Sequence, residues 1–406
     1  MAHKQSLALL FLAAIVSTSL LLLFPSAASA ASVDLAKTGQ TTCYNATGGL
    51  IDCAGTGQDG ESQKGIAWPD PRFTNNQDGT ITDNLTGLTW LKEAQCFGRL
   101  HWFPALDAVN ALANGDCGLT DGSAAGDWRM PNYLELISIA NLGVSNSLAW
   151  FTSFGFTNVQ GLVYWSSTSD IQAPSNAMTY QFNHRFSSRT TKYSDSQTWP
   201  VKGSSTGPAK VWKTGQTTCY DQDEAIACAG TGQDGDLQTG EPMPDTRFIN
   251  NADGTVTDKL TGLVWLQNAN CFGPRIWWDA LLDANSLANG ACNLTDGSSA
   301  GNWRLPNPLE IVSLSVFSHV YPALPPGHPF TNVPTYGSSP LHWTSSNFIA
   351  LPSSAYNGNT TTFGFYGYRG KSEATYLTVW PVRDGNETPL PDPVFDDGFE
   401  GDNSSD

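Results

Sequence analysis

The chain of 406 residues contains eight cysteines and carries a formal net charge of −17. Much of this charge lies in the segment 384–406, which has eight acidic and no basic residues, so the rest of the chain is only mildly acidic. A nucleic-acid-binding domain would need a basic excess, and a strongly sulfated polymer would be repelled at long range. We therefore expect no nucleic-acid partner.

Residues 1–30 have the pattern of a secretory signal peptide. Lys4 precedes an apolar stretch at 7–24, and Ala28-Ser29-Ala30 matches a small-residue cleavage site. The apolar stretch is long enough to span a bilayer, so a membrane anchor is the alternative, but the small residues directly after it favour removal. We expect the processed protein not to span a membrane and to be secreted, periplasmic or held at the outer surface.

The rest of the chain is a duplication, whose halves we call copy one and copy two. Residues 37–44 return unchanged at 213–220, and Cys53 recurs as Cys228, 175 residues later. The period is long enough for each copy to bury its own core, so we predict two independently folded domains. The expected order is a first domain at 31–202, a flexible linker at 203–209, a second domain at 210–383 and a disordered acidic tail at 384–406.

Each copy holds four cysteines at matching positions, as expected of disulfides in an exported protein. Zinc ligation is the alternative, but no pair has Cys-x-x-Cys spacing and no histidine recurs beside the cysteines. Because short local loops close most readily, we pair neighbours in the sequence. The predicted disulfides are Cys43–Cys53, Cys96–Cys117, Cys219–Cys228 and Cys271–Cys292.

In chain order, the sequence of each copy predicts strands, then two helices, then strands. The segment between the first two cysteines is expected to be a small stapled loop or hairpin. Asp78-Gly79 between β-forming residues indicates a β-hairpin, and Pro131 suits the start of a helix. The order predicts an α+β domain with a mainly antiparallel sheet and segregated helices. The expected elements of copy one are a hairpin at 72–83, a turn and strand at 84–91, helices at 105–113 and 131–137, and strands at 164–168, 177–182 and 198–202.

Four motifs occur in the same order in both copies. In copy one they are Asp-Gly-Thr-Ile-Thr-Asp-Asn-Leu-Thr-Gly-Leu-Thr-Trp from Asp78, Trp-Arg-Met-Pro-Asn from Trp128, Tyr-Trp-Ser-Ser from Tyr164 and Trp-Pro-Val-Lys from Trp199. Over residues 70–202 and 245–383 the chain resembles the Lcl C-terminal domain family, named for a collagen-like adhesin of Legionella. The element order is also similar to that of the C-type lectin fold.

The resemblance implies a secreted or surface-exposed module, which in the founding member is an adhesin domain that binds sulfated glycans. The acidic balance of this chain does not support a polyanionic ligand. The chain also has no collagen-like Gly-x-y run, so the trimeric stalk of the founding member is not expected.

Neither a cofactor nor catalysis is expected. Calcium needs several carboxylates, and the segment before the closing strand has few, so calcium binding stays an unsupported alternative. Asp78 and Asp83 resemble a loose calcium loop, but a hairpin turn explains them better. Asp127 has an asparagine, Asn302, as its counterpart, which argues against a shared metal site. The histidines do not correspond between the copies, so we expect no enzyme.

The candidate ligand-binding residues are aromatic and basic. We expect the tryptophans kept in both copies, such as Trp128, Trp165 and Trp199, to pack in the core, and aromatic residues outside the shared frame to be exposed. A basic cluster that includes Lys192, with Lys371 in its thinner counterpart, is either a solvated hairpin face or a contact for an anion or glycan. The candidates are Trp102, His184, Arg185, Arg189, Trp277, Trp278, Tyr366, Tyr368 and Arg369.

The sequence therefore predicts a non-catalytic binding or adhesion protein that recognises a glycan or a cell-envelope partner through two sites. A structural surface protein without a small ligand is the first alternative. An enzyme on a lectin-like frame, related to formylglycine-generating enzymes, is the second. The Asp-Gly-Phe-Glu phrase at 397–400 is either a sorting tag of the kind seen on exported bacterial proteins or part of a solubilising tail.

Overall fold

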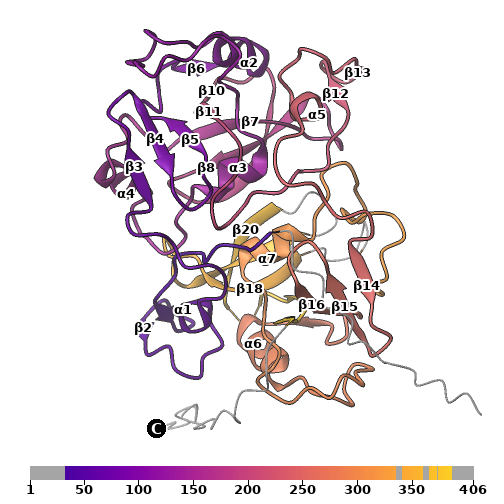
Figure 1. Cartoon of the computed structure of the whole chain (residues 1–406). Coiled ribbons are helices and arrows are strands. Elements are labelled where there is room, and N and C mark those ends of the chain that lie inside the picture. Colours follow the sequence, from indigo (N-terminus) through magenta and orange to yellow (C-terminus); the bar gives the residue numbers. More distant parts are fainter. Residues whose placement is uncertain (1–32, 335–340, 360–364, 373, 386–406) are drawn as a thin grey trace, which may run out of the picture. The chain divides into compact units, whose positions relative to one another are not determined.

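The computed structural model describes residues 33–334, 341–359, 365–372 and 374–385 (Figure 1). Both copies lie in one compact unit, Ala31–Asp406. The predicted signal peptide and residues 386–406 lie outside the described residues. Asp384, which we assigned to the tail, instead ends a strand, and its carboxylate accepts hydrogen bonds from Arg304 and Lys64.

A four-stranded antiparallel sheet of copy one contains three consecutive strands and the last strand of the copy. Its strand order is β11-β5-β4-β3, and Figure 1 shows β3, β4 and β5 side by side. The predicted hairpin is confirmed, because β3 and β4 pair antiparallel, and Asp78 Oδ1 in the turn accepts hydrogen bonds from the backbone and side chain of Thr80, the first residue of β4. Gly79 has φ +88°, and a Cβ there would lie 2.5 Å from the carbonyl oxygen of Gly118. The strands are β3 (Phe73–Asn75), β4 (Thr80–Asp83), β5 (Thr89–Leu91) and β11 (Val201–Lys202).

A second sheet of copy one has five strands in the order β6-β10-β7-β8-β9. All its pairs are antiparallel except β10 with β7. The mainly antiparallel prediction is thus correct, but the strands form two larger sheets in place of one. Of the expected strand at 198–202, Val201 and Lys202 form β11 of the first sheet, whereas residues 198–200 lie outside the strands, where Pro200 has no N–H to continue a ladder. The strands are β6 (Arg99–Leu100), β7 (Val163–Ser169), β8 (Asn176–Gln181), β9 (Phe186–Thr191) and β10 (Ser196–Gln197).

Both predicted helices are present in copy one. The second starts with a capping box, in which Asn132 accepts from the backbone of Glu135 and Glu135 accepts from the backbone of Asn132. Two further short helices were not predicted. The helices are α1 (Asp59–Ser62), α2 (Trp102–Ala111), α3 (Tyr133–Ser138) and α4 (Ser147–Ser153).

Copy two repeats both sheets, with strand orders β14-β15-β16-β22 and β17-β21-β18-β19-β20. Its helices are α5 (Asp234–Leu237), α6 (Trp277–Ser286) and α7 (Pro308–Ser313). Its strands are β14 (Phe248–Asn250), β15 (Thr255–Asp258), β16 (Leu263–Leu266), β17 (Pro274–Arg275), β18 (Leu341–Asn347), β19 (Ser354–Asn359), β20 (Phe365–Gly370), β21 (Leu377–Thr378) and β22 (Val382–Asp384).

All four predicted disulfides are present. Two of them close the stapled segments, which we define as residues 33–68 of copy one and 211–241 of copy two. Each stapled segment holds a two-stranded hairpin, β1 (Cys43–Tyr44) with β2 (Leu50–Ile51), and β12 (Cys219–Tyr220) with β13 (Ala225–Ile226).

Each stapled segment makes hydrogen bonds to the other copy. The Gln40 side chain pairs with the backbone N–H and C=O of Asn347, at 3.0 and 2.6 Å. Gln216 makes the equivalent pair with Ser169. Buried apolar residues of copy two, Phe317 among them, also join the core cluster of copy one. The expectation that each copy buries a separate core is therefore wrong.

The linker 203–209 is also held in place. The Ser205 hydroxyl donates to the carbonyl oxygen of Thr86, and the backbone N–H groups of Gly207 and Ala209 donate to Thr86 and Leu85. The flexible joint that composition predicts is thus bound to the surface of copy one.

Candidate ligand-binding surface

Trp102 and Trp277, which we expected to be exposed, are fully buried. Their indole N–H groups donate to the carbonyl oxygens of Ser166 and Thr344, both at 2.7 Å. The two tryptophans are 175 residues apart, the same spacing as the other residues shared by the two copies. This spacing indicates that they belong to the shared core. Trp278 is half-buried against Trp277, with ring centroids 4.8 Å apart.

A lysine covers each of these two indoles. Lys192 Nζ lies 4.2 Å from the Trp102 ring centroid, and Lys371 Nζ lies 4.3 Å from that of Trp277. Both lysines are buried. Burial lowers the pKa of Lys192 to about 8, partly opposed by Asp221 and Asp223, and lowers the pKa of Lys371 to about 7.

These lysines hold the stapled segments. Lys192 donates to the carbonyl oxygens of Tyr220 and Asp221, and Lys371 donates to the carbonyl oxygen of Tyr44. The interpretation of the basic cluster as a solvated hairpin face is therefore wrong for both lysines, which sit inside the contact between the copies.

The arginines of the basic cluster also have internal partners. Arg185 is fully buried and donates to the carbonyl oxygen of Val144 and to the hydroxyl of Ser147. Arg189 pairs with Asp170 at 3.2 Å and donates to Gln172. Burial of its guanidinium removes Arg185 from the residues that can face a ligand.

Of the remaining candidates, His184 lies just before β9, and Tyr368 and Arg369 lie in β20. Strands β9 and β20, the outer strands of the two five-stranded sheets, are in contact. His184 stacks on Phe186 with centroids 6.0 Å apart, and Phe186 meets Tyr368 at 6.3 Å. Tyr368 in turn stacks on Phe348 at 4.0 Å. We call His184, Phe186 and Tyr368 the aromatic strip; the exposed Arg369 follows Tyr368 in β20, so its side chain leaves the opposite face of the strand.

The aromatic strip is partly open to solvent. His184 is exposed, while Phe186 and Tyr368 are half-buried. Candidates that the sequence assigned separately to copy one and copy two thus form one composite surface. The side chain of Tyr366 lies outside the described residues.

The acidic residues weighed as calcium ligands have structural partners. Asp83 pairs with Arg72, and Asp258 pairs with Arg247. Asp127 accepts from the backbone of Ala124, and Asn302 makes the equivalent bond with Ser299. Asparagine can therefore replace Asp127 without loss of the loop's hydrogen bond. Across the described ranges, no group of three or more His, Cys, Asp or Glu residues is arranged to hold a metal ion.

Two buried acids that sequence reasoning missed lie where the stapled segments dock. Asp59 Oδ2 accepts from Thr38 and Ser346, and Asp234 Oδ2 accepts from Thr214 and Thr168. Burial raises the pKa of each carboxyl to about 6, although these hydrogen bonds act in the opposite direction.

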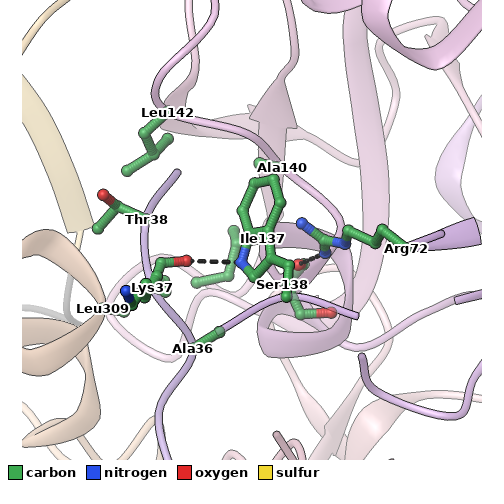
Figure 2. A pocket seen from close by; sticks show the side chains of 10 residues that line it. Ala36, Lys37, Thr38, Arg72, Ile137, Ser138, Ala140, Leu142 and Leu309 are labelled. Carbon is green, nitrogen blue, oxygen red and sulfur yellow. Dashed lines mark hydrogen bonds between the residues drawn. The ribbon is translucent and has the colours of Figure 1, made fainter. Parts of the chain in front are cut away.

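Small cavities adjoin the stapled segment of copy one. Figure 2 shows one of them, bounded by Thr38, Ile137 and Leu309, where Arg72 donates to the carbonyl oxygen of Ser138 at 2.7 Å. Its volume is about 10 Å³, and that of a neighbouring cavity is about 40 Å³. Since one water needs roughly 10–15 Å³, these cavities accommodate water and not a sugar ring.

In the part of the chain that the structure describes, no helix is long and apolar enough to cross a membrane.

Comparison with known proteins agrees with the duplicated motifs. No curated protein and no solved structure matches the chain. The model of the Lcl C-terminal domain matches residues 79–202 and again residues 254–383, which together make up more than half of the chain. The chain therefore belongs to the Lcl C-terminal domain family and contains two tandem copies of that domain.

Proposed function

We propose that this is a secreted or surface-exposed, non-catalytic protein that binds a glycan or a cell-envelope partner. The observation that carries the proposal is the family match of both copies, because the family suggests a surface adhesin-like domain. The four disulfides fit an oxidising, extracellular setting.

The aromatic strip is the surface that we assign to the partner. Half-exposed rings offer flat apolar faces, and the exposed His184, which stacks on Phe186, adds a hydrogen-bonding group beside them. A sugar presents the same combination of an apolar ring face and polar edges. Because β9 of copy one and β20 of copy two both contribute, the strip favours one shared site over the two independent sites expected from the duplication.

We further infer a C-type-lectin-like frame for each copy. In copy one, α2 and α3 precede the tryptophan-bearing strand β7, and β11 pairs with β5 so that the matched region closes on itself. This inference concerns the frame alone, since a fold does not determine its ligand. Superposition of an experimental structure on C-type lectin domains would test it.

A glycan array and a whole-cell binding assay, each with and without calcium, test the proposed function on the mature protein. We expect saturable binding to at least one glycan class or cell surface. No binding in either assay would overturn the proposal and favour a structural surface protein. Turnover of a substrate at a site of converging histidine and carboxylate groups would favour the enzyme alternative.

Variants then test the assigned surface. We expect H184A and Y368A each to weaken binding about tenfold, equivalent to about 1.4 kcal/mol. Y376A is the control, because Tyr376 is 57% exposed and is not part of the strip. Since Tyr368 also packs on Phe348, its variant needs an unchanged unfolding midpoint, whereas the exposed His184 can be removed with little risk to the fold. Equal binding by H184A, Y376A and the wild type would exclude the strip.

A further inference from the structure

We propose that Lys371 and Asn347 form an intramolecular isopeptide bond, a covalent cross-link within copy two. The Lys371 ammonium nitrogen is in direct contact with Asn347 Oδ1, so the Asn347 carboxamide carbon is one bond away from the contacted atom. Both residues are buried, at 1% and 0% exposure. The two positions are 24 residues apart in the sequence, and the bond would enclose the β19–β20 hairpin.

The surroundings suit a nucleophilic lysine. The ring of Trp277 lies 4.3 Å from Lys371 Nζ and that of Trp278 lies 5.6 Å away, so the amine sits against aromatic surface. Burial lowers the pKa of this lysine to about 7, which makes the neutral, nucleophilic amine accessible near neutral pH.

The asparagine is held in one orientation. Its Nδ2 donates to Gln58 Oε1 at 2.6 Å, which leaves Oδ1 facing the lysine. Its backbone N–H and C=O are both bonded to Gln40. The stapled segment of copy one therefore fixes the electrophile of copy two, and such fixed proximity favours an intramolecular reaction.

The reaction is balanced within this pair. Lys371 Nζ attacks the Asn347 carboxamide carbon and forms a new C–N bond, and the bond from that carbon to Nδ2 breaks. A proton from the amine passes to the departing nitrogen, which leaves as ammonia. No oxidant, reductant or other co-reactant is needed.

Copy one provides an internal control. Gln216 pairs with the backbone of Ser169 as Gln40 pairs with Asn347, so Ser169 occupies the position of the asparagine. Lys192 covers its tryptophan as Lys371 does, but it donates to backbone carbonyl oxygens. Both copies thus have the lysine and the tryptophan ring, but at the position of Asn347 copy one has a serine, which has no carboxamide to react.

Intact-mass measurement of the full mature protein tests the cross-link. We expect a mass lower, by one ammonia, than that calculated from the sequence with four disulfides, and a joined peptide containing Asn347 and Lys371 that survives reduction and digestion. Succinimide formation at Asn357-Gly358 also releases ammonia, but it joins no peptides. A wild-type mass without this loss, or the absence of the joined peptide, would overturn the proposal.

Variants assign the bond to this pair. K371R and N347S, the latter copying Ser169, should restore the full mass, whereas K192R should retain the loss of ammonia. N347D should react with loss of water in place of ammonia. Persistence of the cross-linked peptide in K371R or N347S would also contradict the proposal. The wild-type measurement remains decisive if a variant fails to fold.

Discussion

The Ser346 hydroxyl donates a hydrogen bond to Asp59, although 287 positions separate the two residues in the sequence. Thr168 makes the equivalent bond to Asp234, at 2.7 Å. Each stapled segment thus docks on the other copy through a buried carboxyl that also accepts from a threonine of its own segment. Because each stapled segment docks on the other copy, which we call the exchange of stapled segments, the tertiary structures of the two copies are interdependent.

This docking should depend on pH. Burial raises the pKa of Asp59 and Asp234 from 3.8 to about 6, so between these values the folded state binds more protons than the unfolded state. The contribution of these two carboxyls to the free energy of unfolding is fully present below about pH 4 and is lost as the pH rises through about 6. The expected loss in the free energy of unfolding is on the order of 1–3 kcal/mol for each carboxyl.

Denaturant unfolding of the wild type and the D59N/D234N double variant between pH 4 and 8 checks this dependence. Asparagine keeps an acceptor oxygen but does not titrate. The wild type should therefore lose free energy of unfolding relative to the double variant as the pH rises from 4 to 8. A difference that stays constant with pH would show that the two carboxyls do not titrate on unfolding.

Truncation of Gln40 or Gln216 should loosen the contact between the copies. Q40A leaves the backbone N–H and C=O of Asn347 without the partners they have in the wild type, and Q216A does the same to Ser169. Each buried polar group left unsatisfied costs roughly 1–3 kcal/mol. The urea midpoint should fall in both variants and stay unchanged in Q222A, which alters an exposed glutamine. Equal midpoints in all three would contradict this role.

Local features of this fold could be predicted from the sequence because they depend on neighbours in the chain. The Asp78 turn and the disulfide between Cys43 and Cys53 are of this kind. The exchange of stapled segments could not be predicted. Gln40 and Gln216 occupy the same place in identical phrases, so the sequence pattern is the same whether each segment binds its own copy or the other.

The candidate site was predicted only in part. His184 and Arg369 are exposed as a ligand surface requires, but Trp102 and Trp277 are core residues. Their spacing of 175 residues was the available signal. The burial of Lys192 and Lys371 had no such signal, because a lysine in a strand pattern is usually solvated and only the tertiary contact with an indole buries it.

Removal of the longer disulfides should cost more stability than removal of the shorter ones. Cys96 and Cys117 are separated by 21 positions, and Cys43 and Cys53 by 10. Loop-closure entropy predicts a loss of about 3 kcal/mol for C96S/C117S and slightly less for C43S/C53S. Guanidinium unfolding of both double variants, without reductant, measures these losses. A larger loss in C43S/C53S would show that the disulfide acts mainly through docking of the stapled segment.

Loss of the helix-capping glutamates should affect the two copies unequally. Arg129 is bidentate to Glu135, and Arg304 is bidentate to Glu310. Each glutamate also accepts from the backbone N–H of the N-cap asparagine, so alanine removes both a cap and the partner of a largely buried guanidinium. Breaking such a pair costs about 3–5 kcal/mol.

The two arginines differ in what remains after this substitution. Arg304 keeps a second carboxylate, Asp384 at 2.8 Å, whereas Arg129 keeps the carbonyl oxygen of Gly203 at 3.0 Å. E135A should therefore be more destabilising than E310A by about 1 kcal/mol, and D384N combined with E310A should remove the difference. Urea unfolding of the three proteins at one pH measures it. A more damaging E310A would mean that Asp384 does not stabilise Arg304 when Glu310 is absent.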